Sequence, residues 1–204
     1  MFISLEGIDG SGKTTQAAML AKELGTDTLL VREPGGTEAG ERIRILLKDP
    51  SLELDPWAEL LLFCAARAEL VAEVIRPALE EGRTVVCDRF SDSSIAYQGV
   101  ARELGAERVR DLCDLATGSL WPDLTLFLRL HPEMAAERIA AEGRAADRFE
   151  GEGLELQRRV AEGYERLAAD DPDRIRTVDA GGETATVHRA VLAQLRAARG
   201  GVRG

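Results

Sequence analysis

Short apolar segments alternate along the chain with longer stretches in which apolar residues recur every three or four positions. The short segments have the length of strands buried on both faces, and the longer ones show the period of helices. Because such alternation is typical of strands joined by helical crossovers, the pattern predicts an α/β fold with one parallel sheet flanked by helices. The five predicted strands are residues 2–5, 28–31, 84–87, 124–128 and 175–178.

The longest predicted helix, residues 57–79, contains Pro77. Proline lacks the N–H that a helix interior needs, so we expect Pro77 to bend this helix or to end its regular part. Gly118 marks the end of another helix, because glycine is common just after a helix terminus. The clearest helical segments are residues 14–24, 57–79, 107–117 and 184–198.

Residues 142–153 fit neither period. They hold three glycines and two arginines and have little apolar content. This composition indicates a short mobile lid, with an ordinary surface loop as the alternative. The 204 residues show no repeat and no interdomain linker. We therefore expect a single domain, residues 1–204, with the lid at about 142–153.

Charge and composition narrow the classes of function. The net charge of −10 argues against a nucleic-acid partner, which needs a basic face. The longest apolar run, residues 60–66, is too short to cross a membrane, and Glu6 and Asp9 interrupt the N-terminus before a signal-peptide core could form. Three cysteines without C-x-x-C spacing predict free thiols in a reducing compartment, the cytoplasm: Cys64, Cys87 and Cys113.

Residues 7–14 match the phosphate-binding pattern G-x-x-x-x-G-K-[ST] at every fixed position. In such a loop the backbone N–H groups surround phosphates, Lys13 reaches the β- and γ-phosphates, and the Thr14 hydroxyl binds Mg²⁺. A chance match in a glycine-rich turn is the alternative. The predicted strand before the loop and helix after it favour a nucleotide site.

Asp88 follows the third predicted strand and precedes Arg89. A carboxylate in this position of a phosphate-loop protein holds Mg²⁺, directly or through water. The alternative is an aspartate that caps a turn and pairs with the arginine. The carboxyl edge of a parallel sheet is where ligands bind, which favours the metal.

Residues 32–37, Arg-Glu-Pro-Gly-Gly-Thr, follow the second predicted strand. Their two glycines allow a ligand to approach the backbone closely. The alternative is a tight turn in which Thr37 caps the next helix, and the two interpretations are compatible. Arg44 lies two turns into that helix.

Two groups of side chains suit a nucleobase. Phe63 and Arg67 share a helix face, where a ring could stack on a base and a guanidinium could bond its carbonyl, although a core position for Phe63 is the alternative. Ser94 and Gln98, with Tyr97 between them, could read a base edge because both donate and accept hydrogen bonds. For these residues the alternative is a capped surface helix.

Together these motifs resemble those of the bacterial thymidylate kinases, which are phosphate-loop nucleoside monophosphate kinases. The resemblance covers most of the chain and implies a three-layer phosphate-loop NTPase fold. It implies transfer of the γ-phosphoryl group of ATP to dTMP with Mg²⁺, giving dTDP and ADP for dTTP biosynthesis, and a homodimer. It rests on residues 7–15, 32–37, 63 with 67, 87–99, 122–125 and 147–149, of which 88–99 are the most specific.

The resemblance also implies roles for the matching residues of the acceptor site. Phe63 is expected to stack on thymine, Arg67 to bond its carbonyl, and Ser94 and Gln98 to read its edge. Tyr97 is expected to crowd the 2′ position of the sugar. The dTMP phosphate would be held by Arg44 and Arg89 near Glu33, with Asp9 close to the acceptor sugar.

For the donor, the resemblance implies a continuous ATP-binding loop and a magnesium site. Thr14 and Asp88 are the expected Mg²⁺ ligands, partly through water. The ATP-binding residues are Gly7, Ile8, Asp9, Gly10, Ser11, Gly12, Lys13, Thr14 and Thr15.

Some family members carry an arginine inside the phosphate loop, where this chain has Gly10 and Ser11. The family's other arrangement places basic residues in the lid, and Arg144 and Arg148 fit it. We therefore expect lid closure to bring one or both arginines onto the transferring phosphoryl group. The expected catalytic residues are Asp9, Lys13, Arg89, Arg144 and Arg148.

Two other functions remain possible from the residues. A deoxynucleoside kinase would phosphorylate a hydroxyl and need a carboxylate base, for which Glu33 is the candidate. A nucleotide-dependent switch would belong to a different class. Guanine-specific switches commonly carry an N/T-K-x-D motif, which is absent from this sequence.

Overall fold

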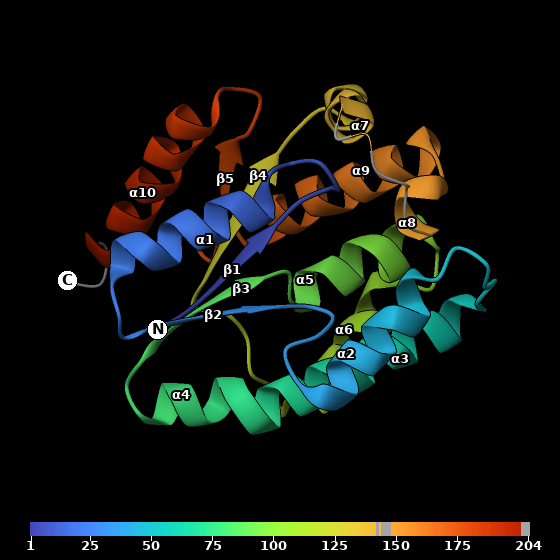
Figure 1. Cartoon of the computed structure of the whole chain (residues 1–204), viewed down its shortest axis with the longest axis horizontal. Helices are drawn as coiled ribbons and strands as arrows, with labels where there is room; N and C mark the ends of the chain where they lie inside the picture. The colour runs from blue at the N-terminus through green and yellow to red at the C-terminus, as the bar shows by residue number, and fades with distance from the viewer. Residues whose placement is uncertain (142, 144–147, 201–204) are drawn as a thin grey trace.

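The chain folds into three layers, with a parallel sheet between two layers of helices (Figure 1). In this computed structural model residues 1–141, 143 and 148–200 are described. The strand order is β2-β3-β1-β4-β5, and all four strand pairs are parallel. The strands are β1 (Phe2–Glu6), β2 (Thr28–Arg32), β3 (Thr84–Asp88), β4 (Leu124–Arg129) and β5 (Ile175–Asp179).

Each predicted strand is confirmed, and each continues one residue further than its apolar run. The five added residues are all charged, because the hydrogen-bonded ladder continues where the strands reach the sheet's carboxyl edge. Two of these residues, Glu6 and Asp88, are buried at that edge. Since buried charges need partners, this edge is where ligand chemistry is expected.

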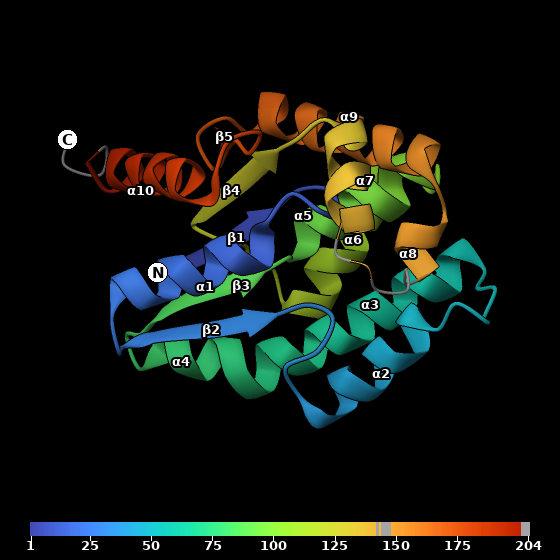
Figure 2. The ribbon, with the colours of Figure 1, turned by 45° about the horizontal axis from the view of Figure 1, so that its top comes forward.

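Helices α1 (Lys13–Leu24) and α10 (Thr184–Gly200) pack together on one face of the sheet. The other face is covered by α4 (Arg76–Glu80), α5 (Ser91–Ser94) with the π-helical η2 (Ile95–Ala101), α6 (Ala106–Thr117) and α9 (Leu154–Asp170). In Figure 2 the strand arrows point towards α7 (Pro132–Ala141), which precedes the expected lid, and α8 (Arg148–Gly151), which lies within it.

The longest predicted helix is found in three consecutive parts. The regular helix α3 (Pro56–Leu70) passes into a π-helical turn, η1 (Val71–Ile75), and then into α4 (Arg76–Glu80). The regular part thus ends before Pro77, and the chain stays helical past it. The wide turn precedes the proline, at the point where a missing N–H disturbs a regular helix. Helix α2 (Glu38–Lys48) packs against α3.

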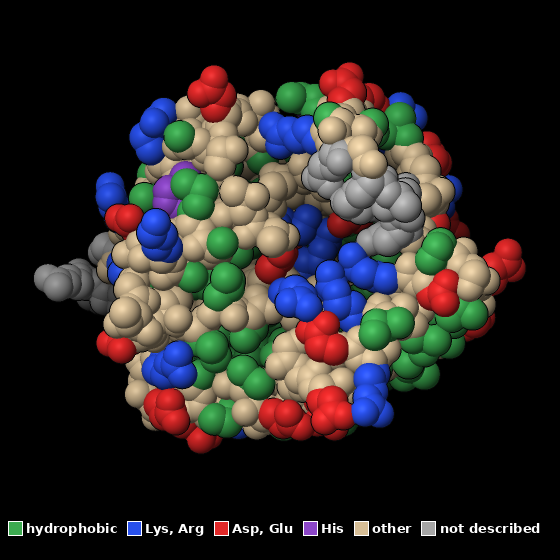
Figure 3. Space-filling view, viewed as in Figure 1, with side chains coloured by type: hydrophobic (Ala, Val, Ile, Leu, Met, Phe, Trp, Pro, Cys, Tyr) green, Lys and Arg blue, Asp and Glu red, His purple; other side chains and the backbone are tan. Residues whose placement is uncertain are grey.

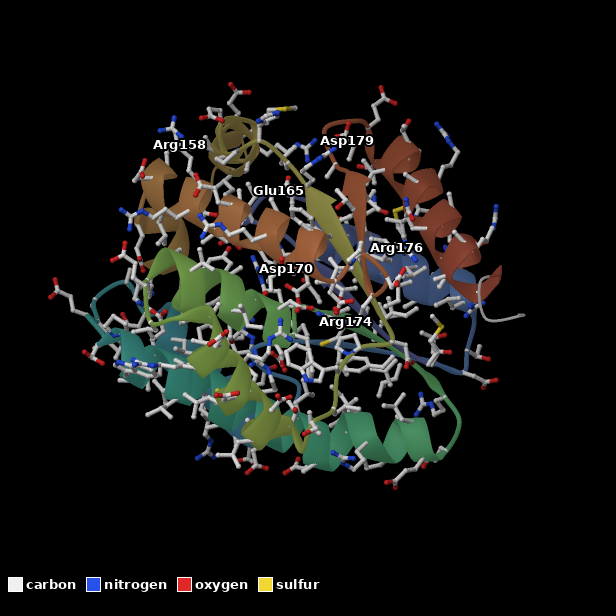
Figure 4. All side chains as sticks on the ribbon, turned by 180° about the vertical axis from the view of Figure 1, so that it is seen from behind. Arg158, Glu165, Asp170, Arg174, Arg176 and Asp179 are labelled. Carbon is white, nitrogen blue, oxygen red and sulfur yellow. The ribbon has the colours of Figure 1, made fainter. Side chains whose placement is uncertain are left out.

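A cluster of ion pairs centred on Arg174 connects α5 with the sheet. Arg174, labelled in Figure 4, donates two hydrogen bonds to Asp92 of α5, at 2.7 and 3.0 Å, and one to Asp171, at 2.7 Å. It also donates to Thr125 of β4 at 3.0 Å. Because Asp92 is 1% exposed, the pair fixes the start of the segment that carries Ser94 and Gln98.

Candidate active site

A cavity of about 780 Å³ opens at the carboxyl ends of β1, β2 and β3. Figure 3 shows Lys and Arg side chains gathered in the hollow at the centre of this face. The cavity's walls come from the loop after β1, the loop after β2 with Arg44, the segment from Asp88 to Gln98, Phe63 and Phe149. The parallel sheet therefore brings together residues that lie far apart in the sequence.

The phosphate loop lies at one end of this cavity. Gly7 and Gly10 have φ angles of +142° and +76°, which side chains rarely allow. A Cβ atom would lie 2.6 Å from the Leu128 carbonyl oxygen at Gly7 and 2.8 Å from that of Ala135 at Gly10. The loop therefore needs glycine at both positions, both for its conformation and for the room around it.

Lys13 is 6% exposed and lines the cavity. Its Nζ donates to the Ile8 carbonyl oxygen at 2.7 Å and to Ser11 Oγ at 3.4 Å. Burial and the nearby Arg89 charge lower the pKa of Lys13 to about 8, against the opposing effect of Asp9. Burial thus makes the charged form of Lys13 unfavourable in free energy. Anionic phosphates bound in the loop would compensate for this.

We expect nucleotide binding to protonate Lys13. At pH 8.5 the unliganded amine is largely neutral, since its pKa is about 8. Phosphates beside it favour the ammonium and raise that pKa, so ATP binding takes up a fraction of a proton. Calorimetry in two buffers of different ionisation enthalpy measures this uptake, and Lys13→Met should abolish it. Equal heats in both buffers for the wild-type chain would contradict the prediction.

Thr14 and Asp88 meet at the same end of the cavity. Thr14 Oγ1 donates to Asp88 Oδ2 at 2.5 Å. A hydroxyl and a carboxylate oxygen are hard oxygen ligands, the kind that Mg²⁺ takes together with substrate phosphates. The predicted pair is therefore brought together by the fold. Among the described residues, no group of three or more His, Cys, Asp or Glu side chains could hold a metal ion.

Arg89 connects the phosphate loop with the rest of the cavity. Its guanidinium donates to the Gly7 carbonyl oxygen at 2.9 Å, to Asp9 Oδ1 at 2.5 Å and to Tyr97 OH at 3.2 Å. It also contacts Ser93 Oγ at 3.1 Å and Tyr164 OH at 3.2 Å. Its φ angle of +72° is unusual for a residue with a side chain. Local structure therefore holds this residue in a strained but well-fixed position.

Two acids lie beside Arg89, the buried Glu6 and the partly buried Asp9. Burial by itself would raise the pKa of Asp9, but the Arg89 and Lys13 charges lower it to about 2. Burial raises the pKa of Glu6 to about 7, and nearby Asp92 adds to the rise. Glu6 accepts from Ser93 Oγ at 2.6 Å and from Tyr164 OH at 2.9 Å. Sequence reasoning missed Glu6, Ser93 and Tyr164, although an acid that ends a buried strand is a usable signal for Glu6.

The far end of the cavity is apolar with a few polar groups. Phe63, Ser94, Tyr97 and Gln98 line it, together with Phe149 from α8. The rings of Phe63 and Phe149 lie 5.8 Å apart, centroid to centroid. Phe63 is therefore a wall of the cavity that also touches the core, which is compatible with both interpretations of its sequence position.

Arg67 lies behind this wall and is 1% exposed. Its Nε donates to Glu33 Oε2 at 2.8 Å, and its Nη2 donates to Ser94 Oγ at 3.0 Å. Glu33 lines the cavity, and burial raises its pKa against the pull of Arg67. The second oxygen of Glu33, Oε1, is buried without a hydrogen-bond partner among the described residues. The Arg67–Glu33 pair thus leaves an acceptor atom at the cavity wall.

Arg44 and the cap of its helix occupy the predicted places. Arg44 lines the cavity and donates to the Pro34 carbonyl oxygen at 2.9 Å. Thr37 Oγ1 accepts from the Gly40 N–H at 3.0 Å, so the predicted helix cap is confirmed. Helix α2, which follows the loop after β2, therefore places the Arg44 guanidinium at the cavity.

The lid prediction falls partly outside the described residues, since Arg144 is not among them. Arg148 begins α8 and is not among the residues that line the large cavity. It lines a smaller hollow, where its Nη2 is 2.6 Å from Glu59 and its Nη1 is 3.5 Å from Glu152. To reach a phosphate in the large cavity, Arg148 would have to leave these partners.

A further stretch of the cavity wall was not predicted. Beyond the phosphate loop, the wall comes from Arg138 of α7, from Gln16 of α1, and from the turn between β5 and α10. Arg138 donates to the Ala180 carbonyl oxygen at 2.9 Å. Because these residues form no recognisable motif, only the fold could assign them to the site: Gln16, Arg138, Ala180, Gly182, Glu183, Thr184 and Val187.

Comparisons with known proteins agree with this geometry. The sequence model of the thymidylate kinase family matches residues 5–191. A thymidylate kinase of Caldanaerobacter subterraneus is 47% identical over 94% of this chain and 92% of that protein. One of Pelotomaculum thermopropionicum is 50% identical over 94% and 90%. The crystal structure of thymidylate kinase from Ehrlichia chaffeensis superposes with a TM-score of 0.79 at 35% identity, covering 96% of this chain and 98% of that one.

Proposed function

The chain belongs to the thymidylate kinase family, whose members phosphorylate dTMP, and from this premise we propose how its cavity transfers the γ-phosphoryl group of ATP to dTMP. The observation that carries the proposal is the position of Arg89. One guanidinium contacts the phosphate loop at Gly7 and the opposite end of the cavity at Tyr97. Two phosphorylated ligands entering from the two ends would therefore meet beside it.

We assign the donor to the end formed by residues 7–15. ATP phosphates would lie along the loop and the N-terminus of α1, with Lys13 against the β- and γ-phosphates. The unpredicted wall of Gln16, Arg138 and the β5–α10 turn lies next to this loop. It is the part of the cavity that we assign to the adenosine.

We assign dTMP to the apolar end. Phe63 would stack on thymine, with Ser94 and Gln98 at its edge and Tyr97 against the sugar. Arg67 would act on the base through Ser94, since its guanidinium is covered by that side chain. The phosphate of dTMP would lie between Arg44 and Arg89. Glu33 and Asp9 would remain the acidic neighbours of the acceptor.

The reaction proposed here needs positioning and charge neutralisation more than proton transfer. The attacking oxygen belongs to a phosphate that is already ionised at pH 7, so no general base is required. Lys13 and Arg89 would spread the negative charge that develops during transfer. A deoxynucleoside kinase would differ in this respect, because Glu33 would have to act as a general base towards the hydroxyl that is phosphorylated.

Mg²⁺ fits the pair formed by Thr14 and Asp88. Both offer oxygen atoms beside Lys13, where the phosphates of ATP would complete the coordination. When bound, the ion would neutralise charge on the β- and γ-phosphates. The chain's own contribution is to hold the hydroxyl and the carboxylate within hydrogen-bond distance of each other.

We further propose that Arg148 moves onto the phosphoryl group when both substrates bind. Arg148→Ala should then lower kcat by roughly 10²–10³-fold while leaving dTMP binding largely intact, because a transition-state contact is lost. Arg102→Ala is the matched control, since Arg102 also pairs with Glu59 and Glu152 but does not belong to the lid. Equal kcat values for the two variants would refute the assignment, and so would a loss confined to dTMP affinity.

A substrate panel tests the function itself. The purified chain, with ATP and Mg²⁺, is offered dTMP, dUMP, dCMP, dGMP, AMP or thymidine, and ADP release is followed. We expect dTMP to give the highest kcat/KM and thymidine to give none. Preference for thymidine would support a deoxynucleoside kinase, and slow hydrolysis without any acceptor would support a switch protein.

Assembly as a homodimer in the cytoplasm completes the proposal. Large apolar side chains on α2 and α3 are exposed, with Ile45 73%, Leu61 53% and Trp57 37% accessible, and exposed apolar groups of this kind favour an interface. No helix among the described residues is long and apolar enough to cross a membrane. Sedimentation equilibrium should give twice the 22.1 kDa mass of one chain, and a 22.1 kDa species at micromolar concentration would contradict the dimer.

A further inference from the structure

Glu59 is a fully buried acid of α3 that does not line the large cavity. Its carboxylate accepts from Gln98 Nε2 at 2.7 Å and from Arg102 Nε and Nη2 at 2.6 and 2.8 Å. The Arg148 Nη2 atom lies 2.6 Å from its second oxygen. Gln98 and Arg102 thus present N–H groups to Glu59, and Arg148 adds a positive charge. Any influence of Glu59 on a ligand must therefore pass through one of them.

Gln98 is the neighbour of Glu59 that reaches the cavity. A side-chain amide has an acceptor end and a donor end, and its orientation follows from the hydrogen bonds around it. A carboxylate can only accept, so the NH₂ end of Gln98 must face Glu59. This leaves the carbonyl oxygen, Oε1, as the end that Gln98 offers to the cavity. Turning the amide over would place two acceptor oxygens against each other in a buried site.

Ser94 is fixed in the complementary sense by another buried ion pair. Its Oγ accepts from Arg67 Nη2 at 3.0 Å, and Arg67 is itself held by Glu33. Because guanidinium has no acceptor, the hydroxyl proton of Ser94 must point elsewhere. Ser94 lines the cavity one helical turn before Gln98. The wall thus presents a donor, Ser94, beside an acceptor, Gln98.

This donor–acceptor order distinguishes pyrimidines by the group at position 4. Thymine and uracil present a carbonyl oxygen, O4, beside an N3–H donor, which complements the wall. Cytosine presents an amino group beside an N3 acceptor, which is the reverse order. We propose that Glu59 is a specificity-determining residue, which makes the cavity select a 4-oxo over a 4-amino pyrimidine by fixing the orientation of the Gln98 amide. This inference rests on the proposed function, because it takes a pyrimidine monophosphate as the acceptor.

Glu59→Gln tests this inference because the new amide can donate as well as accept, which frees Gln98 to turn over. We expect the ratio of kcat/KM for dTMP to that for dCMP to fall by at least about tenfold, since hydrogen-bond readout supplies much of such discrimination. The ratio for dTMP to dUMP should stay unchanged, because both bases present the same edge. General damage to the site would not spare one ratio and lower the other.

Glu152→Gln is the matched control. Glu152 accepts from Arg102 at 2.6 Å and pairs with Arg148, but within the described part of the chain no hydrogen bond joins it to Gln98. This variant should keep both ratios. If Glu59→Gln does not fold, the double variant Glu59→Gln with Arg102→Gln removes the acid together with its arginine partner and should give the same loss. Thermal melting shows which variants are folded.

The outcomes separate this inference from the proposed function. If the wild-type chain does not phosphorylate dTMP, the proposed function fails. If the wild type strongly prefers dTMP over dCMP, and the folded Glu59 variant keeps that preference, the inference alone is overturned. A parallel fall of the dTMP:dCMP and dTMP:dUMP ratios would also overturn it, because Glu59 would then act only on the general structure of the pocket.

Discussion

Replacing Lys13 with methionine is expected to lower kcat by roughly 10³-fold or more, because it removes the cation that the phosphate loop aims at the transferring group. The fold should survive. The pKa of Lys13 in the folded chain, about 8, lies below the ordinary lysine value of 10.5. Folding therefore disfavours the charged side chain, and at pH 7 the ammonium costs stability rather than adding to it. The melting temperature of the variant should equal or exceed that of the wild type.

Lys22→Met is the matched control for this prediction. Lys22 lies in the last turn of the same helix, α1, and is exposed. It should change neither kcat nor the melting temperature. Turnover is measured as ADP release with saturating ATP and dTMP. Near-normal turnover by Lys13→Met would show that catalysis does not need the lysine of the phosphate loop.

Replacing Arg89 with methionine is expected to lower kcat/KM for dTMP by roughly 10³-fold and to destabilise the fold. The guanidinium contacts Asp9, Tyr97 and the Gly7 carbonyl at once. Without it, the buried Glu6 and the partly buried Asp9 would lose the positive charge that faces them. Loss of one partner of a buried ion pair typically costs about 3–5 kcal/mol, so the melting temperature should fall clearly.

Two further variants separate charge from geometry at this position. Arg89→Lys restores a positive charge and should recover part of the stability, but a single ammonium cannot replace the forked contacts, so most of the rate loss should remain. Arg158→Met removes an exposed arginine of α9, labelled in Figure 4, and should have no effect. An Arg89→Met variant that melts and turns over like the wild type would show that Arg89 is not the link between the two ends of the cavity.

The stability effect of Arg89 also predicts a pH dependence. In the folded chain the pKa of Asp9 is about 2, below the ordinary aspartate value of 3.8. The unfolded state therefore binds more protons in this interval, and the stabilisation by Asp9 is present above pH 3.8 and is lost as the pH falls towards 2. The wild type should lose stability over this interval, as measured by denaturant unfolding. Arg89→Met should lose less, because its Asp9 pKa is no longer held down by the guanidinium.

The sequence predicted the fold closely because its signals are local. The apolar runs of the strands, the Gly118 helix end and the Thr37 cap each depend on a few neighbouring residues. Among the strands only the last residues were missed, since a charged residue such as Glu6 or Asp88 continues a ladder without continuing an apolar run. The π-helical turn η1 and the short helix α8 inside the expected lid were also not predicted.

The parts of the site that the sequence did not predict depend on contacts between distant segments. Glu59 meets Gln98 and Arg102 across about 40 positions, and Tyr164 meets Glu6 across 158. No spacing rule links such residues, because the fold alone brings them together. The same is true of Arg148, whose composition-based lid assignment gave no sign that it pairs with Glu59.

The most direct test of the central claim follows the γ-phosphoryl group itself. The wild-type chain is incubated with Mg²⁺, ATP labelled in the γ-phosphate, and equimolar dTMP and thymidine, and the products are separated. We predict that the label appears in the β-phosphate of dTDP at the rate of ADP release. Label in dTMP newly formed from thymidine, or in inorganic phosphate, with none in dTDP, would contradict the assignment of the cavity to phosphoryl transfer between ATP and dTMP.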